Sequence, residues 1–232
     1  MSAAREIANL RSIPTNGNIL LDYTAGDALD GTGTCNIAAG LNALGAATSG
    51  DDNIALGRLA LGAGVTTGND NIAIGATAGD ALTSGSNNIA IGDIALSAAT
   101  TTSDNIAIGR SALAVSIDDG TCNIAIGMTA MGGADVSGDN NIAIGTTALD
   151  ALTSGASNIA IGRLALGAGV ITGAVNIAIG ATAGDAITSG ACNIALGSNA
   201  LGASTTGCDN IALGRDALSG AVACGGSGQA EN

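Results

Sequence analysis

The side chains that could do chemistry in this chain are carboxylates and thiols, because it contains no histidine and no lysine. Adjacent acids occur at Asp51-Asp52 and Asp118-Asp119, and paired carboxylates can serve general acid–base catalysis. Adjacent acids in turns are usually solvated, so we expect no raised pKa of the kind that acid catalysis needs. No nucleophile–base pair can be formed from the remaining residue types. The sequence therefore predicts a protein that is not an enzyme and has no catalytic residues.

Metal ligands and cofactor loops are equally sparse. Single aspartates recur in similar surroundings at Asp70, Asp104, Asp139 and Asp209, but the Gly-Gly-x-Gly-x-Asp pattern of calcium-binding rolls does not occur. The five cysteines form no CxxC pair, and their odd number is typical of reduced thiols. They are Cys35, Cys122, Cys192, Cys208 and Cys224. No phosphate-binding glycine loop is present either. We expect no metal and no cofactor.

The charge and the hydrophobic pattern limit the partners. A formal net charge of −13 argues against nucleic-acid binding, which needs a basic patch. Asn, Gly or Asp interrupts every apolar run well before it could span a bilayer, so no membrane insertion is expected. The first 17 residues lack the apolar core of a signal peptide.

A repeat organises the whole chain. The string Asn-Ile-Ala-Ile-Gly, or a close variant, returns every 17 or 18 residues, first in degraded form at Asn18. Counting each asparagine as position zero, position one is always Ile, position seven is always Ala, and position eight is usually Leu. Arginine stands at position five in one coil of three, at Arg58, Arg110, Arg163 and Arg215. Repeats of this length stack on copies of themselves, because one unit alone cannot bury its apolar face.

The alternation around Ile has period two, which indicates a short strand, and the following glycine allows a bend. We expect a second extended segment around the Ala-Leu pair, with turns elsewhere. The predicted fold is all-β: a parallel β-solenoid of about 12 coils. The isoleucines at position one are assigned to core columns: Ile37, Ile54, Ile72, Ile89, Ile106, Ile124, Ile142, Ile159, Ile177, Ile194 and Ile211. The asparagines are assigned to a stacked amide ladder: Asn36, Asn53, Asn71, Asn88, Asn105, Asn123, Asn141, Asn158, Asn176, Asn193 and Asn210.

Three segments follow from this pattern: an N-terminal segment 1–17, a repeat rod 18–218, and a Gly-rich polar tail 219–232. The rod has a thin core of small side chains, so a single solenoid would be only marginally stable. Burying its alanine-rich face against sister chains would add apolar contact. We therefore expect a homotrimer.

The repeat Asn-Ile-Ala-Ile-Gly-x-x-Ala-Leu with a Thr/Ser-Gly turn resembles the repeats of phage tail-fibre shafts. It is also similar to the head repeats of trimeric autotransporter adhesins, which form parallel β-rolls in trimers. Separately, residues 4–10 look like an N-terminal segment of marine phage tail proteins. The resemblance implies a fibre or needle on a virion, assembled in the host cytoplasm, that attaches the virion to a host surface receptor. Arg5, Glu6, Ile7 and Leu10 would then belong to a segment that attaches the fibre to a virion tail or capsid component.

Three other functions stay open. An ice-binding solenoid would present an outward threonine array, and position twelve is often Thr, although Val65, Ile117, Asp135 and Val170 interrupt it. A bacterial adhesin head would place the chain outside the cell or on its surface. A hexapeptide-type acyltransferase also stacks coils in trimers, but it usually needs a catalytic histidine.

Overall fold

The computed structural model describes residues 16–22, 24–29, 31–116 and 120–220. Within them the chain is a parallel β-solenoid with one three-residue strand in each coil and no helix. The predicted fold class, an all-β parallel solenoid, is confirmed. Arg5, Glu6, Ile7 and Leu10 lie outside the described residues, as does most of the C-terminal tail.

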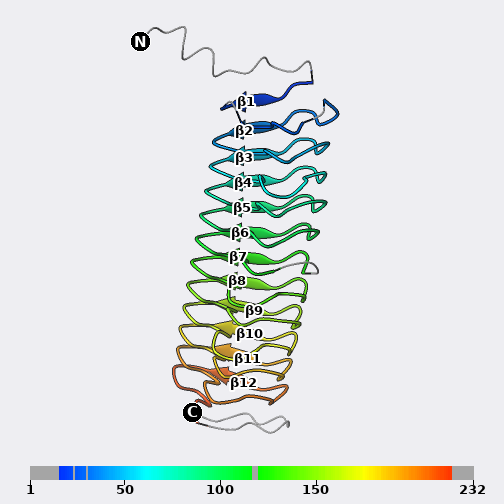
Figure 1. Ribbon diagram of the computed structural model, residues 1–232. Coiled ribbons are helices and arrows are strands. Elements are labelled where there is room, and N and C mark those ends of the chain that lie inside the picture. Colours follow the sequence, from blue (N-terminus) through cyan, green and yellow to red (C-terminus); the bar gives the residue numbers. More distant parts are fainter. Residues whose placement is uncertain (1–15, 23, 30, 117–119, 221–232) are drawn as a thin grey trace, which may run out of the picture. The chain divides into compact units, whose positions relative to one another are not determined.

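The chain divides into two compact units, Met1–Ser111 and Ala112–Asn232. The strands of the first unit are β1 Ile19–Leu21, β2 Ile37–Ala39, β3 Ile54–Leu56, β4 Ile72–Ile74, β5 Ile89–Ile91 and β6 Ile106–Ile108. The strands of the second unit are β7 Ile124–Ile126, β8 Ile142–Ile144, β9 Ile159–Ile161, β10 Ile177–Ile179, β11 Ile194–Leu196 and β12 Ile211–Leu213. In each unit the strands stack in chain order (Figure 1).

Neighbouring strands pair in parallel with equivalent repeat positions opposite each other. Ile54 pairs with Ile72 in the first unit, and Ile177 pairs with Ile194 in the second. The register is reinforced by a bond from the position-one amide to the carbonyl of the next asparagine, as from Ile37 to Asn53 at 2.8 Å. Strict repetition of the sequence thus becomes strict stacking of identical side chains.

The position-one isoleucines are not core residues of the chain, so their assignment to core columns is wrong. In each strand it is the middle residue, usually alanine, that is buried, and the two flanking residues are half-buried or exposed. The interior contains the alanines of positions two and seven and the leucines of position eight, such as Ala55, Ala60 and Leu61, all 0% exposed. Because side chains alternate along a strand, burial of the middle alanine directs the two flanking residues to the outer face.

The expected second extended segment is also absent from nearly all described coils. The Ala-Leu pair lies in a turn where positions six and eight adopt the left-handed conformation, as at Leu59 (φ 58°) and Leu61 (φ 48°). Such values are uncommon for leucine. Bonds between coils hold them: the Leu59 amide donates to the Leu41 carbonyl, and the Leu61 amide donates to the Ala78 carbonyl. Outside the strands, the described residues contain one isolated parallel bridge, between Leu152 and Ile171.

Candidate functional site

The asparagine column forms a continuous hydrogen-bond ladder within each unit. All the position-zero asparagines are nearly inaccessible, with at most 3% of their surface exposed. Asn71 shows the pattern: its backbone amide and its Nδ2 both donate to Oδ1 of Asn53, at 3.0 and 3.1 Å. The same Nδ2 donates to the Gly85 carbonyl at 2.9 Å. The amide therefore links one coil to the preceding coil and closes the turn of its own coil, which makes this column structural.

A second, shallower ladder runs two residues before the asparagines, and no sequence motif had indicated it. The amide of Thr34 donates to Oδ1 of Asp51 at 2.7 Å, and the amide of Asp51 donates to Oδ1 of Asn69 at 2.8 Å. In the second unit the amide of Thr121 donates to Oδ1 of Asp139 at 2.8 Å. Asp51 and Asp139 are thus hydrogen-bond acceptors for neighbouring coils. Asp118 and Asp119 lie outside the described residues.

Among the described residues, three aspartates at position nine have clearly raised pKa values. Burial raises the pKa of the Asp150 carboxyl above its ordinary value, and a hydrogen bond from the Gly133 amide partly opposes the shift. Burial likewise raises the pKa values of Asp80 and Asp185. Oδ1 of Asp150 and Oδ1 of Asp185 are buried without a hydrogen-bond partner. Because the three acids lie on different coils, they do not form a catalytic pair.

The thiols and carboxylates do not converge on a metal site in the described part of the chain. No group of three His, Cys, Asp or Glu side chains there could hold an ion. Cys35, Cys122 and Cys192 are exposed free thiols, and Cys208 is a half-buried free thiol. Across the residues with described positions, no helix is long and apolar enough to cross a bilayer.

The outer face of the sheet is the most distinctive surface in each unit. It consists of the aliphatic side chains of positions one and three, which stack from coil to coil in two columns that run across the strands. Between the end strands most of these side chains are half-buried, and three at position three are exposed: Ile74 is 37% exposed, Ile144 38% and Ile179 41%. Parallel sheets are normally covered on both faces, whereas here only the alanine side is covered. We call the position-one and position-three side chains the isoleucine face.

A column of exposed hydroxyls lies on another side of the coils. The carbonyl that accepts a hydrogen bond from the asparagine Nδ2 belongs to a glycine or, once, to Thr102. These residues stack from coil to coil, as Gly50 does on Gly68. The residue just before each of them is an exposed serine or threonine in ten described coils. These residues are Thr32, Ser49, Thr67, Ser84 and Thr101 in the first unit, and Ser137, Ser154, Thr172, Ser189 and Thr206 in the second. These residues do not stand at a fixed number of positions after the asparagine, because some coils contain one more residue than others. The regularity is therefore not visible at position twelve of the repeat.

No protein-family model, curated protein or solved structure matches this chain.

Proposed function

We propose that this chain is the shaft of a structural, adhesive fibre without catalytic activity, formed by parallel copies of itself. The observation that carries the proposal is the isoleucine face, a continuous apolar sheet surface within each unit. Large exposed apolar surfaces of soluble assemblies usually mark interaction sites. The sequence predicted that the alanine-rich face would contact sister chains. In the structure the alanines lie inside the coil, so the isoleucine face is the surface proposed for this contact.

The number of copies is proposed to be three. A cyclic assembly around a common axis would cover one flat face of each copy and leave the turns exposed. The turns would then carry the contacts with other molecules, as surface loops commonly do. The resemblance of the repeats to phage tail-fibre shafts supports a location on a virion and a role in host attachment.

The oligomer is tested by light scattering on the purified full chain, with small-angle X-ray scattering to measure elongation. We expect a mass near three times the 21.7 kDa chain in a slender particle. A monodisperse single chain would reject the proposal. For the location, antibodies raised against the chain should label the tails of virus particles in electron micrographs. Labelling confined to a cell surface would favour a bacterial adhesin instead.

The hydroxyl column supports ice binding as a second candidate. Hydroxyls repeated at the strand spacing of about 4.8 Å form a regular array of hydrogen-bonding groups. A thermal-hysteresis measurement on the native chain tests this function. Activity that is lost in a Thr67→Val, Thr101→Val variant would favour it, and no hysteresis would reject it.

A further inference from the structure

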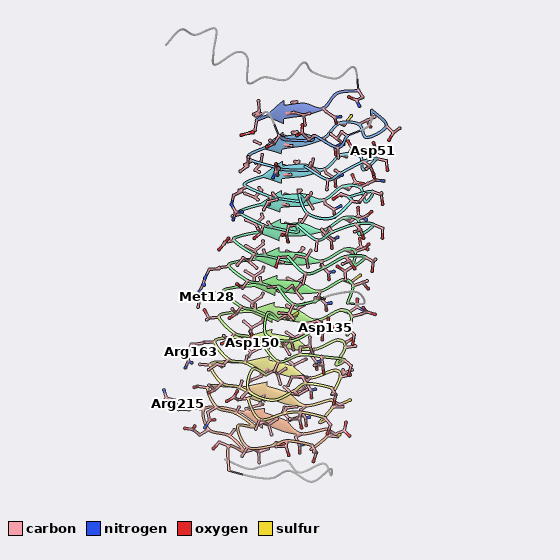
Figure 2. The ribbon with its side chains drawn as sticks, in the orientation of Figure 1. Asp51, Met128, Asp135, Asp150, Arg163 and Arg215 are labelled. Atoms are coloured by element: carbon pink, nitrogen blue, oxygen red, sulfur yellow. The ribbon has the colours of Figure 1, made fainter. Side chains whose placement is uncertain are left out.

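The two edges of the isoleucine face carry opposite charges. Position minus one, just before each asparagine, lies where the strand begins, and position five lies just beyond the glycine where the strand ends. The acidic edge contains Asp52, Asp70, Asp104 and Asp209, and the basic edge contains Arg58, Arg110, Arg163 and Arg215. All eight side chains are exposed. In the described coils Asp93 is the one acid at position five of the basic edge. In the second unit, Arg163 and Arg215 project outward beyond the arrowheads of the strands (Figure 2).

The edge aspartates and the edge arginines also tend to occur in the same coils. Asp52 and Arg58 flank β3, Asp104 and Arg110 flank β6, and Asp209 and Arg215 flank β12. In each pair the strand lies between the two charges, so they stand at opposite edges of the same coil. Three of the four arginines therefore share a coil with an edge aspartate. Arg163 is the exception, since Ser157 stands at position minus one of its coil.

We propose that the isoleucine face binds a second copy of this chain in parallel and in the same axial register, with the arginine edge of one copy against the aspartate edge of the next. The inference rests on the proposed assembly and specifies its geometry. An antiparallel pair, related by a two-fold axis along the strands, would place arginine edge against arginine edge. A parallel rotation about the coil axis brings unlike edges together, and zero axial shift aligns Arg58 with Asp52 and Arg110 with Asp104. Complementary charges of this kind fix orientation and register.

Site-directed cross-linking on the full chain tests this geometry. The five native cysteines are first replaced by serine. Three of them stand at position minus one, which already accepts Ser157, and Cys208 stands at position minus two, which accepts Ser86. Asp52→Cys and Arg58→Cys are then introduced together. Cysteine occurs naturally at position minus one with the same left-handed backbone, as at Cys35 (φ 57°), so the first change suits the fold. A short bismaleimide, which spans the reach of an arginine–carboxylate pair, is the probe.

We expect covalent dimers and trimers on a denaturing gel from the Asp52→Cys, Arg58→Cys chain. Chains with only one of these substitutions should remain single. The matched control combines Arg58→Cys with Asp104→Cys, which sits three coils away, about 14 Å along the axis, and should not cross-link. Cross-linking in this control, or in the Arg58→Cys chain alone, would overturn the register or the orientation.

Light scattering on the same samples separates the two proposals. An assembly of unchanged mass in which the Asp52→Cys, Arg58→Cys chain forms no cross-link would overturn the geometry and leave the fibre proposal in place. A single-chain mass for the cysteine-free background and for the native protein would reject both. Reversing the edge with Arg58→Asp and Arg110→Asp should weaken association at least about tenfold. An unchanged association constant would contradict the role of the arginines.

Discussion

At the scale of single residues, stability depends on polar groups inside the coils. A buried primary amide must find partners for two donors and one acceptor, and here each amide finds them in the adjacent coils and in its own turn. Since all these partners are themselves buried, losing one side chain leaves several groups without hydrogen bonds. An apolar residue of any size at position zero should therefore destabilise the coils.

Replacing Asn71 with alanine should reduce the free energy of unfolding by about 2–4 kcal/mol, because the Gly85 carbonyl and the Asn88 amide lose their partners. Urea denaturation followed by circular dichroism measures the change. Asn87→Ser is the control, since Asn87 is exposed and Ser157 occupies the equivalent position elsewhere. It should change stability by less than about 0.5 kcal/mol. Equal effects of the two changes would contradict the ladder.

Asp150 should make stability depend on pH. Its folded pKa is raised above the ordinary value of 3.8, so the folded chain holds the proton in a range where the unfolded chain has released it. Stability therefore falls as the pH rises from about 4 through the folded pKa, and then levels off. Asp150→Asn should remove this fall and be more stable near neutral pH, by less than about 1 kcal/mol because the carboxyl is partly solvated.

Melting temperatures measured between about pH 4 and pH 7 would reveal the difference between native and variant curves. Asp93→Asn, at an exposed position, controls for the loss of one negative charge. Parallel curves for the native chain and the Asp150→Asn variant would show that burial of this carboxyl does not couple to folding.

At the scale of the element, each coil depends on a close approach of backbones after the strand. Gly92 has φ 136°, and a Cβ placed there would lie 2.5 Å from the Gly109 oxygen of the next coil. Glycine thus meets two requirements at position four, a backbone conformation that other residues rarely adopt and the absence of a side chain.

Gly92→Ala should lower the free energy of unfolding by about 3 kcal/mol or more, through backbone strain and steric overlap together. Gly214→Ala is the matched control, because Gly214 has φ 115° at the same repeat position and nothing lies within 4 Å of its added Cβ. Its loss should be about 1–2 kcal/mol, from strain alone. If both variants lost equal stability, the contact between coils would be unimportant.

The sequence was sufficient to predict the solenoid, the strand positions and the coil length, because each follows from strict periodicity. It could not show which face of the strand is interior, since Asn, Ala and Gly on one side and Ile on the other are all uncharged. The turn around Leu59 and Leu61 was missed because neither residue favours a left-handed backbone. That conformation is imposed by hydrogen bonds between coils, which a single repeat does not contain. The glycine at position eight of the coil that begins at Asn71, Gly79, was also not explained by the sequence. Cδ1 of Leu82 would lie 3.1 Å from a Cβ placed there, a contact that exists only in the packed interior.

At the scale of the whole molecule, the isoleucine face is the surface on which the proposed assembly depends. Two aliphatic columns per unit are too regular to be incidental exposure, and covering them would contribute about 25 cal/mol for each Å² of apolar surface removed from water. The proposed assembly therefore depends on the residues that point away from the interior of the single chain.

Replacing Ile72, Ile89 and Ile106 with threonine should shift the assembly toward a single 21.7 kDa chain while leaving the coils folded, since threonine also favours strands. Light scattering measures the mass, and circular dichroism checks the fold. Val65→Thr is the control: Val65 is 54% exposed but lies outside the strands, away from the isoleucine face. An oligomer that survives the triple substitution would show that another surface holds the copies together.

The uneven coil length has a practical consequence. In the longer coils that begin at Asn53, Asn123 and Asn158, the interior place is taken by Thr66, Val136 or Ile171, each 0% exposed. The additional length is accommodated outside, where Val65 and Asp135 are exposed. These bends already tolerate variation in length without disturbing the packed interior. They are therefore suitable points for grafting foreign peptides, which a multi-chain scaffold would display in several copies at one height.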